Sequence, residues 1–183
     1  MYILLQRKNR RSYEEMLEMI VEQCRDRLQK SLKIDKIIID FELAVCKAVQ
    51  RIFPECQISF CHFHFCQAIY RRVQKLNLFT SFANDPTIYA QVRILMALAY
   101  LPPNDIDLVF SKLNDNASEM VKPLMEYMNK NFISSTARFK KDHWSVYELM
   151  VQELPRTSNN AESWHSRLNA LLRCKHPGFL VIS

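Results

Sequence analysis

Two spacings of hydrophobic residues alternate along residues 1–76. Short apolar runs have the length and residue types of β-strands, and KIIID is typical of a strand buried on both faces. These strand-like runs lie at 2–6, 36–40 and 56–60. Between and after them, apolar residues recur every three or four positions, which predicts helices with one buried face. The predicted helices lie at 13–28, with Ser12 as N-cap, at 42–52, ended by Pro54, and at 62–76. Strand followed by helix, three times over, predicts an α/β sheet with crossover helices.

From about residue 84 the strand-like runs stop and only helical spacing remains. One helix is expected at 87–100, and Asn104 or Asp105 fits as the N-cap of the next. Ser118 fits as the N-cap of a third, whose opening turn must hold Pro123 because proline has no backbone N–H to donate. Residues 84–135 are therefore expected to be all-helical. The expected units are a partial sheet with its helices (1–76), a mostly helical segment (77–158), and a region with one last helix (159–183).

Composition narrows the function classes. Gly178 is the only glycine, where average usage gives roughly 7%, which argues against glycine-rich phosphate loops and dinucleotide-binding folds. The formal net charge of +6 permits a nucleic-acid partner without requiring one. Six cysteines are too scattered for a small disulfide scaffold. No secretory signal and no apolar stretch long enough to cross a bilayer is visible, so the expectation is an intracellular chain with reduced thiols.

Two acidic residues occupy positions that suit either capping or chemistry. Asp40 ends the isoleucine-rich strand, at the edge of the sheet where open α/β proteins bind ligands, but it also suits a helix N-cap. Glu162 falls in the first turn of the last predicted helix, after the cap-like residues Ser158, Asn159 and Asn160, and also suits a capping box. Taken singly, each is better explained as a capping residue.

Sequence blocks that follow one another in a fixed order favour chemistry over capping for these two residues. The first is IIIDFELAVCKAVQRIFPECQISFCHFHFCQAIYRRVQ, with D-F-E, F-P and C-x-x-H-F; the second is LAYLPPNDIDLVFSKL; the third is HWSVYELMVQELPRTSNNAESWHSRLN, followed by HP. In this order and spacing the chain resembles the catalytic domain of Mutator-like element (MULE) transposases. The resemblance implies an incomplete RNase H-like (DDE transposase) α/β core with a large all-helical insertion.

The resemblance also implies a site and its partners. Asp40 would be the second acid of the catalytic triad and Glu162 the third, holding Mg²⁺ or Mn²⁺ through hard oxygen ligands, with their carboxylates within about 8 Å. The implied reaction is metal-dependent DNA cleavage and strand transfer. The implied partner is DNA at transposon ends, with a homo-oligomer also open, and the implied location is the nucleus.

Cys61 and His64 form the C-x-x-H motif at the start of a predicted helix. Three residues apart, they share one helix face. A zinc site normally needs four ligands, and a second pair at finger-like spacing is absent; His62 and Cys66 are expected elsewhere on the helix. The resemblance favours a structural or substrate-positioning motif flanking the active site, while metal binding and a simply packed helix start remain open.

The chain departs from the family pattern in two places. Ser163 follows the glutamate where many relatives have glycine, a minor change. More seriously, no acid occupies the family's first-aspartate position, because Asp26 falls within a helix and Asp35 at the wrong end of a strand. The expectation is a transposase fragment, inactive as it stands. The alternative is a domesticated, non-catalytic DNA- or protein-binding protein.

DNA contact, if retained, is expected from basic residues rather than from a base-reading motif. The candidates are Arg71, Arg72, Lys75, His165 and Arg173, with RFKK at 138–141 adding charge. A solvated helix face explains each of them equally well. No helix-turn-helix is visible, so target recognition is expected from a separate module.

Overall fold

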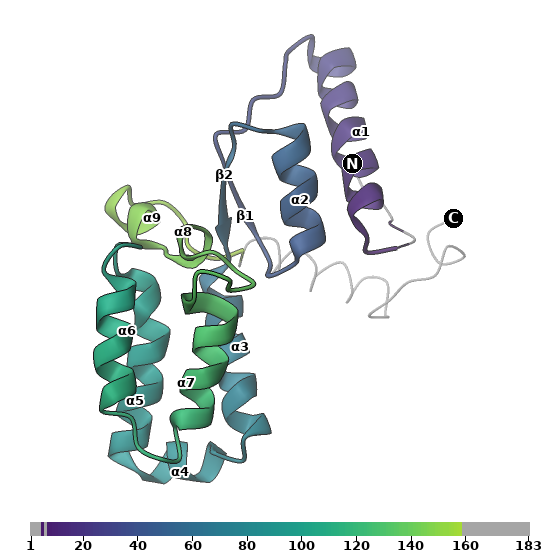
Figure 1. Cartoon of the computed structure of the whole chain (residues 1–183). Helices are drawn as coiled ribbons and strands as arrows, with labels where there is room; N and C mark the ends of the chain where they lie inside the picture. Colours follow the sequence, from purple (N-terminus) through teal and green to yellow (C-terminus); the bar gives the residue numbers. More distant parts are fainter. Residues whose placement is uncertain (1–4, 6, 159–183) are drawn as a thin grey trace.

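The computed structural model describes residue 5 and residues 7–158. Its sheet has two parallel strands, β1 (Lys36–Ile39) and β2 (Gln57–Phe60), paired from Lys36↔Gln57 to Ile39↔Phe60. The crossover between them is α2 (Leu43–Ile52). In Figure 1, α2 and α1 (Arg10–Leu28) lie on one side of the strands. Parallel pairing requires such a crossover, because a hairpin can join only antiparallel strands.

A group of helices extends away from the sheet (Figure 1). It begins with α3 (His62–Lys75), which follows β2 directly. The remaining members are α4 (Phe79–Asn84), α5 (Pro86–Ala97), η1 (Leu98–Tyr100), α6 (Ile106–Asp115), α7 (Lys122–Met128) and the π-helical turn η2 (Asn129–Ile133). We call residues 62–133 the helical lobe. Pro86 and Pro123 both sit in opening turns, where the missing N–H costs nothing.

After the helical lobe the chain returns to the sheet. The short helices α8 (Lys141–Trp144) and α9 (Tyr147–Val151) lie on the side of the strands opposite α2 (Figure 1). Val146 N–H donates to the Ala99 carbonyl (2.7 Å), and the Ser145 hydroxyl donates to the Leu101 carbonyl (2.8 Å). We call residues 134–158 the returning segment. These two bonds hold it against the end of η1.

One hydrophobic core runs through the sheet and the helical lobe. At its centre the Phe65 ring stacks on Trp144, with centroids 4.8 Å apart and planes within 8°. Both side chains are fully buried, and the indole N–H donates to the Phe132 carbonyl at 3.2 Å. Phe41, just after β1, stacks on Phe60 at 4.6 Å. Because aromatic rings bury large apolar areas, this cluster joins β1, β2, α3 and α8 into one unit.

The predicted helices and strands that fall on described residues are confirmed, with several local corrections. Asn9, not Ser12, is the N-cap of α1: its side chain accepts the Ser12 N–H. The strand at 36–39 is only half-buried except at Ile39, so the prediction of burial on both faces is wrong for these residues. The helix α4 was not expected. Asp105 is the N-cap residue of α6, one of the two predicted, although its side chain makes no capping hydrogen bond. The N-cap of α7 is Val121, so the prediction of Ser118 is wrong.

Two predicted elements lie outside the described residues: most of the strand at 2–6, and the last helix with Glu162, His165 and Arg173. The coarse fold is therefore a mixed, mostly helical α/β arrangement with a small parallel sheet. Among the described residues, no helix has both the length and the apolar character needed to span a membrane.

Candidate functional site

The candidate site lies where the two parallel strands end. Asp40 directly follows β1 and Cys61 directly follows β2. The Cys61 N–H donates to the Ile39 carbonyl at 2.8 Å, which continues the strand pairing to the edge of the sheet. Parallel strands bring their carboxyl ends to the same edge, so two residues far apart in sequence become neighbours.

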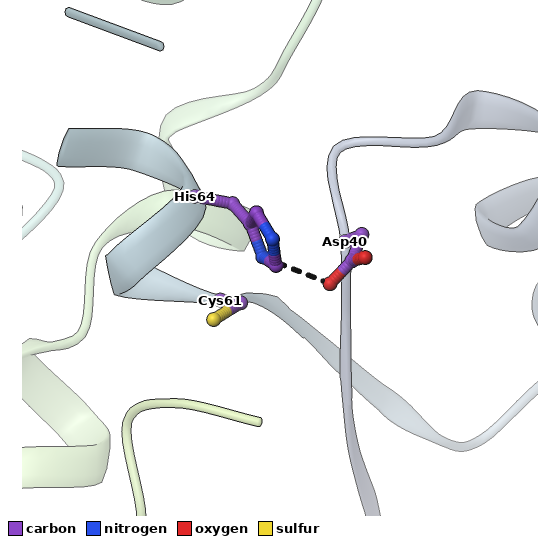
Figure 2. Close-up of side chains that lie close together, drawn as sticks. All are labelled: Asp40, Cys61 and His64. Atoms are coloured by element: carbon purple, nitrogen blue, oxygen red, sulfur yellow. Dashed lines mark ion pairs between the residues drawn. The ribbon is translucent and has the colours of Figure 1, made fainter. Parts of the chain in front are cut away.

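His64 completes the cluster from the first turn of α3. Its Nδ1 lies 2.9 Å from Asp40 Oδ1, as Figure 2 shows. The His64 side chain is 24% exposed and that of Asp40 58% exposed, while Cys61 is fully buried. One ligand atom from each of the three residues, an oxygen, a sulfur and a nitrogen, lies within 4.8 Å of the other two. We call Asp40, Cys61 and His64 the edge cluster.

Ser158 contacts the edge cluster from the returning segment. Its backbone N–H and its hydroxyl both donate to Cys61 Sγ, at 3.5 and 3.4 Å. Two residues earlier, the Arg156 carbonyl accepts the His62 N–H at 3.0 Å, which satisfies one of the backbone donors at the start of α3. Residues 156–158 therefore lie along the first turn of this helix.

The second cysteine–histidine pair at the start of α3, His62 and Cys66, makes a different contact. His62 Nε2 lies 3.5 Å from Cys66 Sγ, and the imidazole packs on the Tyr100 ring with centroids 4.8 Å apart. Burial lowers the pKa of His62 and raises that of Cys66 to about 11, because an apolar environment disfavours both charged forms. This pair is therefore neutral at physiological pH. His62 and Cys66 are not in the edge cluster.

The turn after Asp40 is held from α1. The Tyr13 hydroxyl donates to Glu42 Oε1 at 2.9 Å. Burial, followed by the hydrogen bond and charge of Glu42, raises the pKa of Tyr13 to about 12, with a smaller contribution from the Asp40 charge. In the D-F-E sequence, Asp40 thus faces solvent, Phe41 enters the core and Glu42 anchors α1. Sequence reasoning assigned no role to Tyr13 or Glu42, and no local pattern marks a contact across 29 positions.

The donor atoms of the edge cluster differ from the ligands that Mg²⁺ and Mn²⁺ prefer. Mg²⁺ takes near-octahedral oxygen ligands, and carboxylate, carbonyl and water oxygens also suit Mn²⁺. Among the described residues the cluster offers one carboxylate, with sulfur and nitrogen as its other donors. These residues alone do not fit a hard-cation site, and Glu162, the second expected acid, lies outside the described part of the chain.

The basic residues predicted to contact DNA lie near the other end of α3. Arg71 and Lys75 are exposed, and the Arg72 guanidinium lies over the Tyr127 ring at 5.2 Å from its centroid. The Arg72 Nε is buried and has no hydrogen-bond partner among the described residues. His165 and Arg173 lie outside that part of the chain. From His64 to Arg71 is roughly 10 Å along the helix, at about 1.5 Å per residue.

The fold and the edge cluster together describe a mostly helical α/β protein that carries a carboxylate, a thiol and an imidazole at the carboxyl ends of two parallel strands. The model of the MULE transposase domain family matches residues 1–68, a region that contains all three residues of the edge cluster. The predicted relationship to MULE transposases is therefore confirmed over residues 1–68. No curated protein and no solved structure gives a significant match to the chain.

Proposed function

We propose that the chain is a transposase-derived domain of RNase H-like, DDE type, in which Asp40 and Glu162 are the second and third acids. The observation that carries the proposal is the position of Asp40 at the carboxyl end of a parallel strand, beside the C-x-x-H motif and within the region matched by the MULE family. In this proposal residues 1–76 are the partial core, 77–158 the helical insertion, and 159–183 the segment with the third acid.

The position of Ser158 supports Glu162 as a partner of Asp40. Ser158 bonds to Cys61, whose sulfur belongs to the edge cluster, and Glu162 follows four residues later. Four residues span at most about 14 Å when fully extended. The chain length therefore permits Glu162 to reach Asp40, and Ser158 lies at the edge of the sheet where the proposal needs that acid.

We propose that these 183 residues bind DNA but do not cleave it. Two-metal phosphoryl transfer requires carboxylates that hold both ions, and the proposed site has two acids, Asp40 and Glu162, with none at the first position of the triad. Binding needs no metal, because Arg and Lys side chains contact phosphates directly. The surface proposed for this contact is the far part of α3, with Arg71, Arg72 and Lys75. Transposon ends, a homo-oligomer and a nuclear location belong to the same proposal.

The test is DNA binding as a function of salt, with two matched double variants. Arg71→Gln with Lys75→Gln removes two exposed charges from α3, and Arg25→Gln with Arg27→Gln removes two exposed charges from the far end of α1. Each phosphate contact contributes about −0.9 to the slope of log K against log [salt] on duplex DNA. The α3 variant is expected to weaken binding and reduce the steepness by up to about 1.8, whereas the α1 variant leaves both unchanged.

Equal losses in the two double variants would contradict a surface on α3. Failure of the unmodified chain to bind duplex DNA even at low salt would contradict the DNA-binding proposal itself and favour a domesticated, protein-binding role. Circular dichroism of each variant checks that the helices are retained.

A further inference from the structure

The edge cluster has the donor set of a zinc site rather than that of a magnesium site. Thiolate sulfur and imidazole nitrogen are borderline-soft ligands that Zn²⁺ prefers, and carboxylate oxygen commonly joins them. We propose that Asp40, Cys61 and His64 together bind one Zn²⁺ ion. This inference rests on the geometry of the three residues and stands whether or not the chain contacts DNA.

The separations in the edge cluster are close to those of a tetrahedral ion. Zinc bonds of about 2.0–2.3 Å place neighbouring ligand atoms about 3.3–3.8 Å apart. The three donor atoms lie within 4.8 Å of one another, and Asp40 Oδ1 lies 2.9 Å from His64 Nδ1, so adjustments of about 1 Å or less bring all three to these separations. Asp40 is the residue free to make that shift, because its side chain is 58% exposed and projects from the turn after β1 (Figure 2).

The surroundings of Cys61 resemble those of a metal thiolate. Its sulfur is buried and accepts two hydrogen bonds, from the N–H and the hydroxyl of Ser158. Such outer contacts orient metal ligands. The backbone of Cys61 is fixed by its bond to Ile39. The thiol is therefore held in place before a metal arrives.

Three protein ligands leave one position of a tetrahedral ion open. Zinc sites with three protein ligands fill the fourth position with water or a substrate atom. Asp40 is also the acid assigned to the proposed transposase site. Zn²⁺ in the edge cluster would therefore occupy Asp40 and exclude a hard cation from that carboxylate. The consequence is competition: the affinity for Zn²⁺ should far exceed that for Mg²⁺.

The test is titration of the whole, reduced chain with Co²⁺, which takes the same ligands and reports on them by absorption. We expect one Co²⁺ per chain, a tetrahedral visible spectrum, a sulfur-to-cobalt charge-transfer band, and displacement by Zn²⁺ but not by millimolar Mg²⁺. Cys61→Ser should abolish the charge-transfer band. His64→Ala and Asp40→Asn should each weaken Co²⁺ binding at least about 100-fold, because each removes one of three ligands.

The matched control is the neighbouring pair on the same helix. Cys66→Ser with His62→Ala removes the same two residue types from outside the edge cluster and should leave both the spectrum and the affinity unchanged. Ser158→Ala removes one donor to Cys61 Sγ and should weaken binding about 10-fold while retaining the charge-transfer band.

Two results would overturn the proposal. One is absence of Co²⁺ and Zn²⁺ binding at micromolar chain concentration. The other is binding that survives Cys61→Ser and disappears with Cys66→Ser and His62→Ala, which would place the metal at the second pair. Because Cys61→Ser alters a buried residue, His64→Ala at the partly exposed edge provides the independent measurement. Folding of every variant is checked by its thermal transition.

Discussion

The Tyr13 hydroxyl donates a 2.9 Å hydrogen bond to Glu42 Oε1, and this contact joins α1 to the turn that presents Asp40. Tyr13 is buried, and Glu42 lies two residues beyond the acid. The geometry of the edge cluster therefore depends on a residue that cannot reach it directly. Removing the hydroxyl should loosen the turn without changing any side chain of the cluster.

Tyr13→Phe is expected to remove an alkaline transition in stability. The pKa of Tyr13 is raised from 10.0 to about 12 in the folded chain, so the neutral form is favoured by folding. Its stabilising contribution is complete below pH 10 and is lost as the pH rises from 10 toward 12. Denaturant unfolding of both chains across this window checks the prediction. Parallel curves of the two chains against pH would contradict it.

Trp144→Ala is expected to destabilise the fold by about 3–5 kcal/mol, because it leaves a cavity between Phe65 and Phe132. It also removes the indole donor to the Phe132 carbonyl. Leu108→Ala, at a side chain 61% exposed on α6, is the control and should change stability by less than about 0.5 kcal/mol. Equal effects in urea denaturation would mean that the stacked ring pair is not central to the core.

Glycine substitutions are expected to stabilise the chain where three residues adopt left-handed backbone angles. Gln29, Asn77 and Glu153 have φ of 51°, 55° and 55°. Such angles cost little for glycine and are tolerated by asparagine. Gln29→Gly and Glu153→Gly should therefore each add up to about 1 kcal/mol, and Asn77→Gly less. Thermal melts test the order, and a gain at Asn77 larger than at Gln29 would contradict it.

Purified chain mixed with Mg²⁺ or Mn²⁺ and DNA carrying transposon ends is expected to give no cleavage and no strand transfer. The proposed site has two acids, Asp40 and Glu162, and lacks the first acid of the triad, which leaves too few carboxylates to hold two ions. The measurement is strand nicking on labelled DNA. Metal-dependent nicking lost in Asp40→Ala and Glu162→Ala, but kept in Asp35→Ala at the opposite end of β1, would refute the prediction.

The parts of the fold that the sequence predicted well depend on local periodicity. The helices at 43–52 and 62–75 and the strands beside them follow from apolar spacing, with Pro54 marking an end. Convergence of Asp40 with Cys61 also follows from sequence, once two parallel strands are expected to end at one edge. The alternation of strand-like and helical runs does not show how much of each strand other elements cover. The burial of residues 36–39 was therefore overestimated.

The remaining features required tertiary information. Ser158 suited a helix cap, yet its hydroxyl bonds to a sulfur 97 positions earlier. Asn9 and Ser12 are both good caps, and only the observed backbone decides between them. His64 could be placed on the face of Cys61 by its spacing, but its approach to Asp40 depends on the angle at which α3 leaves β2.

The hydrogen bonds that join Cys61 and His62 to residues 156–158 affect which parts of the chain can vary in length and sequence. The entry and the exit of the intervening segment meet at one point, and the helical lobe within it leaves the sheet and returns to it before α8 and α9. Segments whose ends are close together can be lengthened, shortened or exchanged without moving the framework that carries them. The helical lobe can therefore diverge in size and surface from one chain to another while the junction at Cys61 keeps the carboxylate, thiol and imidazole in register.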